Sequence, residues 1–192
     1  PSITPLVLQR FEASAWYVQR NMLLLLASMP DWPAEFDPLA YLGNHDIRVR
    51  REAIKLALRL PARRDEAVCT GLEDRDEQIV SIAVRAAAEG CPARALPIIL
   101  AQLDRGDWPG DIRAQFIRAM ATIPSPRARD WMVRRCYVRR WWLLRTRLAP
   151  KSPEVLAALA GLAAGWSRDP NAFAVLALAR ACNDPELRAA AS

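Results

Sequence analysis

The sequence predicts an all-α protein built from repeated helix pairs, and three observations lead to this class. Ala is abundant in the 192 residues, whereas there are only 7 Gly and 3 Tyr, and Ala loses no side-chain entropy when it enters a helix. Hydrophobic residues make up 52% of the chain, which is enough to bury a large core. Finally, one helical segment recurs in altered form along most of the chain, as it does in repeat architectures.

The clearest copy of the repeat lies between residues 45 and 72. It predicts a first helix over 46–58, a break at Pro61 and a second helix over 63–72. Asp74 and Asp76 then restart the pattern, and we expect these aspartates to cap helices rather than to bind a metal.

Apolar residues recur at matching positions in the other copies. Aligning Val49 with Val18, Ile79 and Ile112 gives spacings of 31, 30 and 33 residues, and an apolar residue lies four positions after each of them. Residues 184–191 open in the same way. These spacings predict consecutive helix pairs along the chain.

The helical phase of residues 47–60 supports a two-sided helix. At about 100° per residue, the apolar residues gather on one face and the charged residues on the opposite face. Arg50 is the exception, because it breaks the apolar pattern.

The opening Asp46-x-x-Val49-Arg50-x-x-Ala53 resembles the HEAT-repeat family, including the short bacterial HEAT-like repeats of phycobilisome lyases. The resemblance implies a right-handed α-α superhelix of about five helix pairs, with residues 1–192 forming a single array. In that family the motif arginine pairs with a motif aspartate along the stack, which implies structural roles for Arg50, Arg113 and Arg188. Gln19 and Val80 depart from this motif.

The two ends of the sequence resemble incomplete repeats. Residues 5–11, which follow Thr4, are similar to the second helix of a repeat whose first helix is missing, and an N-terminal cap is the alternative interpretation. Residues 184–191 begin a repeat that is not finished. We therefore expect the chain to be a fragment of a longer protein.

An irregular segment rich in Arg and Trp interrupts the repeat at about residues 125–152. From Ile112 to the next motif valine, Val155, the spacing is 43 residues. Eight arginines oppose a single acid, Asp130, within 127–147, which gives a net charge of +7; they are Arg127, Arg129, Arg134, Arg135, Arg139, Arg140, Arg145 and Arg147. The pattern does not fit one amphipathic helix, and we expect a helix from Pro126 that packs inward through Ala128, Trp131, Cys136 and Val138.

This Arg/Trp segment is the candidate binding site. Trp and Arg are typical of protein-binding hot spots, and they also suit phosphate pairing with base stacking. In a third interpretation the tryptophans only cover a junction between repeats, with the arginines solvated. The candidate binding residues are Trp131, Arg134, Arg135, Arg139, Arg140, Trp141, Trp142, Arg145 and Arg147.

Other functional classes find little support in the sequence. The basic residues are almost all Arg, since Lys55 and Lys151 are the only lysines. This composition is typical of a GC-rich coding bias, so the formal charge of +6 is not evidence of function.

The four cysteines form no C-x-x-C pair, and His45 is the only histidine, so we expect buried thiols and no metal or cofactor. The longest apolar run is too short to span a membrane, and we expect a cytoplasmic protein.

We therefore predict a non-catalytic scaffold or adaptor that binds a protein or peptide partner on a concave surface formed by the second helices. The alternative is a nucleic-acid-binding protein that uses residues 127–147. A third possibility is an enzyme similar to the alkylpurine DNA glycosylases, because Asp107, Trp108 and Asp111 supply the residue types that those enzymes use. We expect these acids to cap the helix near Asp111 instead, and we assign no catalytic residue.

Overall fold

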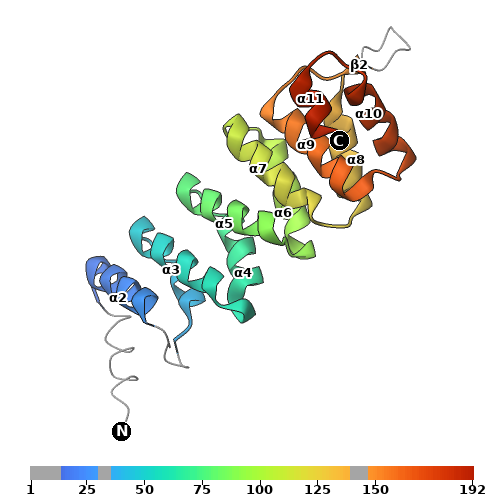
Figure 1. The fold of residues 1–192 in the computed structure, drawn as a ribbon. Coiled ribbons are helices and arrows are strands. Elements are labelled where there is room, and N and C mark those ends of the chain that lie inside the picture. Colours follow the sequence, from blue (N-terminus) through green and yellow to red (C-terminus); the bar gives the residue numbers. More distant parts are fainter. Residues whose placement is uncertain (1–13, 30–35, 139–146) are drawn as a thin grey trace. The chain divides into compact units, whose positions relative to one another are not determined.

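The structure is a computed structural model that describes residues 14–29, 36–138 and 147–192, and this part of the chain is mostly helical (Figure 1). The predicted all-α class is confirmed. The α-helices are α2 (Trp16–Ser28), α3 (Ile47–Arg59), α4 (Pro61–Leu72), α5 (Glu77–Glu89), α6 (Leu96–Arg105), α7 (Gly110–Ala121), α8 (Pro126–Cys136), α9 (Pro153–Trp166), α10 (Pro170–Arg180) and α11 (Pro185–Ala190). The remaining elements are the short 3-10 helices η1 (Pro38–Tyr41) and η2 (Ala93–Ala95) and the strands β1 (Tyr137–Val138) and β2 (Arg147–Leu148). The helix expected over residues 5–11 lies outside the described residues.

The helix boundaries follow from local chemistry. Asp46 caps α3, because its carboxylate accepts a hydrogen bond from the backbone N–H of Arg48 at 2.8 Å. Leu60 is extended, as residues before proline usually are, and Pro61 then begins α4. The predicted break between the two helices of this pair is therefore confirmed.

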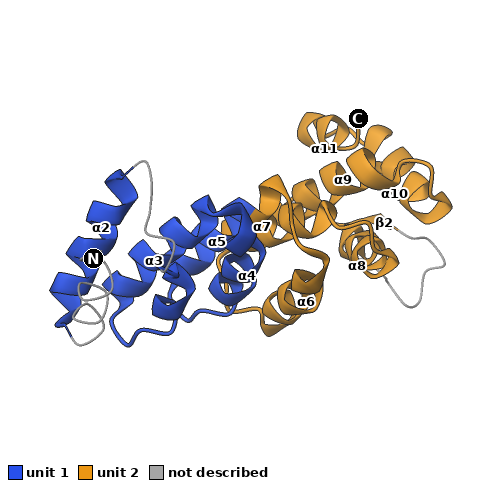
Figure 2. Ribbon diagram, turned by 90° about the horizontal axis from the view of Figure 1, so that it is seen from below, with its two compact units in different colours: residues 1–86 blue, residues 87–192 orange. Residues whose placement is uncertain are grey.

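The chain forms two compact units, residues 1–86 and 87–192 (Figure 2). In the first unit, α3 packs against α2, η1 and α4. Val49, Ala53 and Ala57 form the fully buried face of α3. Gly71 of α4 lies against Ile54 and Ala83, and a Cβ atom at this glycine would be 2.7 Å from the Cβ of Ala83.

In the second unit, α9 is the central helix. It packs against α7, α8, α10 and α11, while α8 also contacts α10. Gly161 permits this close packing, since a Cβ atom at this position would lie 2.6 Å from the Cβ of Ala121 and 2.9 Å from the sulfur of Met132. Phe116, Leu159 and Leu162 are fully buried around it.

Arg50 departs from the apolar pattern of α3 because it links two consecutive helix pairs. Its guanidinium donates to both oxygens of Asp74 at 2.9 and 3.1 Å, and to the carbonyl of Asn44 at 3.0 Å. Next to it, Arg51 binds Asp76 at 2.9 and 3.0 Å. Asp76 also accepts from the N–H of Ile79 at 3.1 Å, so this aspartate caps α5 as predicted.

Arg113 makes the corresponding contacts in the second unit. It donates to the carbonyl of Leu103 at 2.8 Å and to the carboxylate of Glu154 at 2.9 and 3.3 Å. The acid is thus a glutamate at the start of α9 and not the expected aspartate. Arg188 donates to the carbonyl of Cys182 at 3.1 Å, and Gln19, which replaces the motif arginine in α2, accepts from the amide of Asn44 at 2.8 Å.

Residues 125–152 contain a regular helix followed by a short β-ribbon. Strands β1 and β2 are antiparallel, with Tyr137 opposite Leu148 and Val138 opposite Arg147. As predicted, α8 buries Ala128 and Cys136. The prediction for Val138 is wrong, because this residue belongs to the ribbon and is 40% exposed.

Candidate functional site

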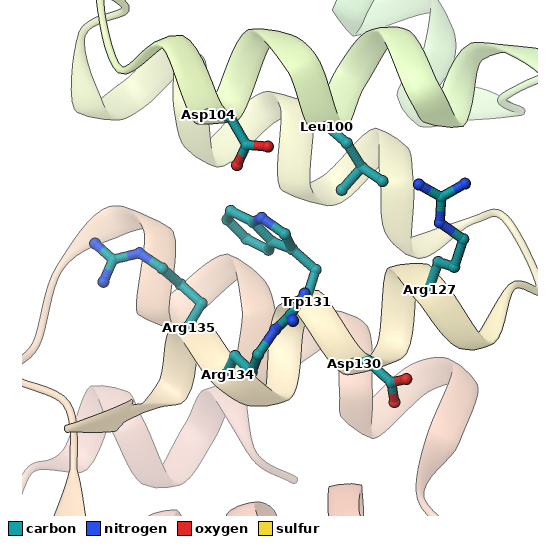
Figure 3. Close-up of a pocket in the computed structure, with 7 residues that line it drawn as sticks. All are labelled: Leu100, Asp104, Arg127, Asp130, Trp131, Arg134 and Arg135. Atoms are coloured by element: carbon teal, nitrogen blue, oxygen red, sulfur yellow. The ribbon is translucent and has the colours of Figure 1, made fainter. Parts of the chain in front are cut away.

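A pocket of about 720 Å³ opens between α6 and α8 within the second unit (Figure 3). Two of its lining residues, Leu100 and Asp104, come from α6. The others come from α8 and are Arg127, Asp130, Trp131, Arg134 and Arg135. All of these positions lie in described helices.

The periodicity of α8 places its pocket residues on one side of the helix. Positions 127, 131, 134 and 135 are separated by whole turns and therefore share a face. Ala128, Met132 and Cys136 occupy the buried side and fix the rotation of the helix. Pro126 at the first helical position favours the helix start, as its ring presets the backbone angle φ.

The centre of the pocket is apolar. The indole of Trp131 points from α8 toward α6, where Leu100 and Asp104 face it (Figure 3). Trp131 and Leu100 are both half-buried. The pocket therefore offers partly exposed aromatic and aliphatic surface with charged groups around it.

Two of the charged groups in the pocket are neutralised by neighbours. Arg135 donates to Glu154 at 2.7 Å. Asp130 accepts from Arg129 at 2.8 Å, and Arg129 also binds Asp169 at 2.7 Å. The hydrogen bond that Arg129 donates to Asp130 raises the pKa of the Arg129 guanidinium.

Glu154 accepts hydrogen bonds from both Arg113 and Arg135. Burial disfavours its charged form, but the hydrogen bonds from Arg113 and Arg135 outweigh that effect and lower the pKa of the carboxyl group. Glu154 is therefore a carboxylate at neutral pH, and it holds the guanidinium of Arg135 at the pocket wall.

The other charged groups in the pocket are available to a ligand. Arg127 and Arg134 are exposed, and no described residue forms an ion pair or hydrogen bond with either guanidinium. The carboxylate of Asp104 is likewise exposed and has no partner within the described ranges.

The pocket contains three of the residues that the sequence predicts for the site: Trp131, Arg134 and Arg135. Arg147 does not line it, because it lies exposed in strand β2. The remaining predicted residues fall outside the described part of the chain; they are Arg139, Arg140, Trp141, Trp142 and Arg145.

The sequence analysis did not select the four other lining residues of the pocket, which are Leu100, Asp104, Arg127 and Asp130. Arg127 and Asp130 lie in the Arg/Trp segment, and the spacing of Arg127, Trp131 and Arg134 on one helix face is a signal that could have selected Arg127. Leu100 and Asp104 come from a helix about 30 residues earlier. The repeat pattern predicts both helices as second helices of consecutive pairs, but it does not show which residues of the earlier helix face α8.

The other candidate residues serve structural contacts. The indole N–H of Trp108 donates to Gln102 at 3.0 Å, and its ring lies 6.2 Å from that of Phe116. The expected cap by Asp111 is wrong, because α7 has no side-chain cap and Asp111 only lies in its first turn. His45 is exposed, and its backbone carbonyl accepts from Arg50.

The four cysteines form no disulfide within the described residues, and burial raises the pKa of the Cys136 thiol to about 12. Contrary to the expectation of four buried thiols, Cys69, Cys91 and Cys182 are only half-buried.

Within the described ranges, no cluster of three or more His, Cys, Asp or Glu side chains could hold a metal ion. Among the helices of the described residues, none has the length and apolar character needed to cross a membrane. Comparison of the chain with protein-family models, with curated proteins and with solved structures finds no match.

Proposed function

We propose that this chain is a non-catalytic helical-repeat scaffold that binds a protein or peptide partner in the pocket between α6 and α8. The observation that carries the proposal is the combination in one pocket of a half-buried Trp131 with two guanidinium groups, those of Arg127 and Arg134, that pair with no described residue. Trp and Arg are the residue types in which interface energy most often concentrates.

The shape of the site supports a side chain as the group that enters it. A concave site with an apolar centre and a few polar groups at its edge buries an inserted residue and fixes its orientation. Leu100 and Trp131 supply the apolar centre, and the charges of α8 supply the edge. In a HEAT-like array, α6 and α8 would be second helices, which are the helices expected to form the concave surface.

The alternative of nucleic-acid binding receives less support from the same pocket. The carboxylate of Asp104, which has no partner among the described residues, lies in the pocket and would repel a phosphate backbone. In addition, Arg135 is already neutralised by Glu154. A mixed set of charges suits a peptide better than it suits a polyanion.

Selection of random 12-residue peptides on the immobilised chain tests the proposal. Enriched peptides are then measured by fluorescence anisotropy against the wild type, Trp131→Ala and Trp16→Ala. The last variant is the matched control, since it removes a half-buried tryptophan from the other unit. We expect affinity to fall at least about tenfold in Trp131→Ala, as is common for an anchoring aromatic residue, and to be unchanged in Trp16→Ala. Equal binding to all three proteins, or no enrichment, would contradict the proposal.

Titration with labelled duplex and single-stranded oligonucleotides at two salt concentrations tests the alternative. On duplex DNA, Z phosphate contacts give a slope of about −0.9Z in a plot of log affinity against log salt. A steep slope that flattens in Arg127→Ala and Arg134→Ala, together with absence of peptide binding, would replace peptide recognition by nucleic-acid recognition.

A further inference from the structure

We infer that the pocket recognises an extended acidic segment of its partner in which a large apolar residue is flanked, two positions away, by Asp or Glu. The inference rests on the proposed function and names the pattern of residues that the pocket selects. The apolar side chain would contact Trp131 and Leu100, and the acid would bind Arg127.

The balance of charge in the pocket favours an acidic ligand. Arg135 and Asp130 already have partners at 2.7 and 2.8 Å, so neither contributes an unsatisfied charge. The remaining charged groups are the guanidiniums of Arg127 and Arg134 and the carboxylate of Asp104. Among the described residues, two cations without partners against one anion leave a positive site along α8.

The spacing along α8 sets the spacing within the ligand. Arg127 precedes Trp131 by four residues, which corresponds to about 6 Å along a helix axis. In an extended peptide, residues i and i+2 point to the same side and are separated by about 6.6 Å. An acid two positions from the apolar residue therefore reaches Arg127 while the apolar residue contacts Trp131.

A second acid on the other side of the apolar residue would face Arg134. This arginine lies three residues beyond Trp131, or about 4.5 Å along the axis. The long side chain of Arg134 can cover the difference between this distance of about 4.5 Å and the spacing of about 6.6 Å between alternate residues of the peptide. The complete pattern is thus acid, any residue, large apolar residue, any residue, acid.

Asp104 restricts where the acids can lie. Its carboxylate projects from α6 toward Trp131 (Figure 3) and repels a second carboxylate on that side of the pocket. Acidic ligand residues are therefore confined to the side formed by α8. Replacing Asp104 by Asn removes this repulsion, and we expect it to strengthen the binding of acidic peptides several-fold.

Charge reversal at Arg127 provides the test. Two peptide-display libraries are compared, one with a fixed Glu-x-Leu core and one with a fixed Lys-x-Leu core. We expect the wild type to enrich the Glu library at least about tenfold over the Lys library, the size expected for one charge-assisted hydrogen bond. In Arg127→Glu the preference should reverse.

The variant is expected to fold, because Arg127 lies in the first turn of α8, where an acid interacts favourably with the helix dipole. Circular dichroism checks this point. Arg118→Glu is the matched control, since Arg118 is exposed on α7 and has no partner among the described residues. It should select the same library as the wild type.

The possible outcomes separate this inference from the proposed function. If peptides bind through Trp131 but Arg127→Glu keeps the preference of the wild type, the acidic pattern is wrong and the binding pocket stands. If neither library enriches on the wild type while random peptides still bind through Trp131, the acidic pattern is wrong and the binding pocket stands; if random peptides do not bind either, both are overturned. Enrichment of the Lys library on the wild type would also overturn the acidic pattern.

Discussion

Glu154 accepts hydrogen bonds from two arginines that belong to different helices. Arg113 of α7 and Arg135 of α8 both reach it, at 2.9 and 2.7 Å, and only 11% of its side chain is exposed. Removing one member of a buried charge cluster leaves the others without compensation. The stability of the second unit should therefore depend strongly on this single carboxylate.

Glu154→Gln should lower the free energy of unfolding at pH 7 by about 1–3 kcal/mol, the usual cost of losing a charged hydrogen-bond partner. Since the pKa of Glu154 is lowered in the folded state, its contribution is complete above the pKa of the unfolded chain and is lost as the pH falls through the folded value. The difference between wild type and variant should therefore narrow below about pH 4.

Urea denaturation at several pH values measures this difference. Glu186→Gln is the control, because Glu186 binds Lys151 with 61% of its side chain exposed, and exposed pairs contribute little. A loss in Glu154→Gln no larger than in the control would show that the cluster does not stabilise the fold.

Arg50 gives a second prediction at the scale of single residues. Arg50→Lys should cost about 1–3 kcal/mol, although it keeps the charge, because an ammonium group cannot make two parallel bonds to Asp74 and also reach the carbonyl of Asn44. Thermal unfolding measures the loss. Arg118→Lys is the comparison, and its effect should be small because Arg118 is exposed and has no partner among the described residues. Equal effects would contradict the role assigned to Arg50.

At the scale of helices, replacing each of the two glycines of α9 by alanine should have opposite effects on stability. Gly161→Ala should destabilise the protein by about 1–3 kcal/mol, because the new methyl group meets Ala121 and Met132 at less than 3 Å. Gly165→Ala in the same helix should stabilise it by up to about 1 kcal/mol, since the nearest neighbour is 3.9 Å away and Ala favours the helix. Chemical denaturation of both variants checks the signs, and a gain in stability for Gly161→Ala would show that α9 can move away from α7.

The helices show what the sequence can and cannot predict. Periodicity, prolines and aspartates predicted the helix pair around Pro61 because these signals act within a few residues. For the same reason, the end of α8 was missed: Val138 continues an apolar pattern and yet belongs to a ribbon, whose partner strand starts nine residues later. Trp131 was expected to pack inward, but it is only half-buried and lines the pocket. Leu100 and Asp104 could not be assigned to the site because the repeat pattern does not show which residues of α6 face α8.

At the scale of the whole molecule, the chain divides into two compact units, and the helices of the second unit pack around α9. Local opening can occur in one part of a protein without global unfolding. Gly161→Ala should therefore speed amide hydrogen exchange in α7, α8 and α9 while leaving α3 and α4 unchanged. Peptide-resolved mass spectrometry measures this, and faster exchange throughout the chain would indicate a single cooperative molecule.

The β-ribbon after α8 has a practical consequence. The N–H of Ala149 donates to the carbonyl of Cys136 at 2.7 Å, so the chain leaves α8 and returns toward α9 at the same point. Because this closure lies at the base of the ribbon, the path from α8 to α9 does not depend on how many residues are inserted beyond Val138. An affinity tag introduced between Val138 and Arg147 should therefore not stretch the connection between the helices.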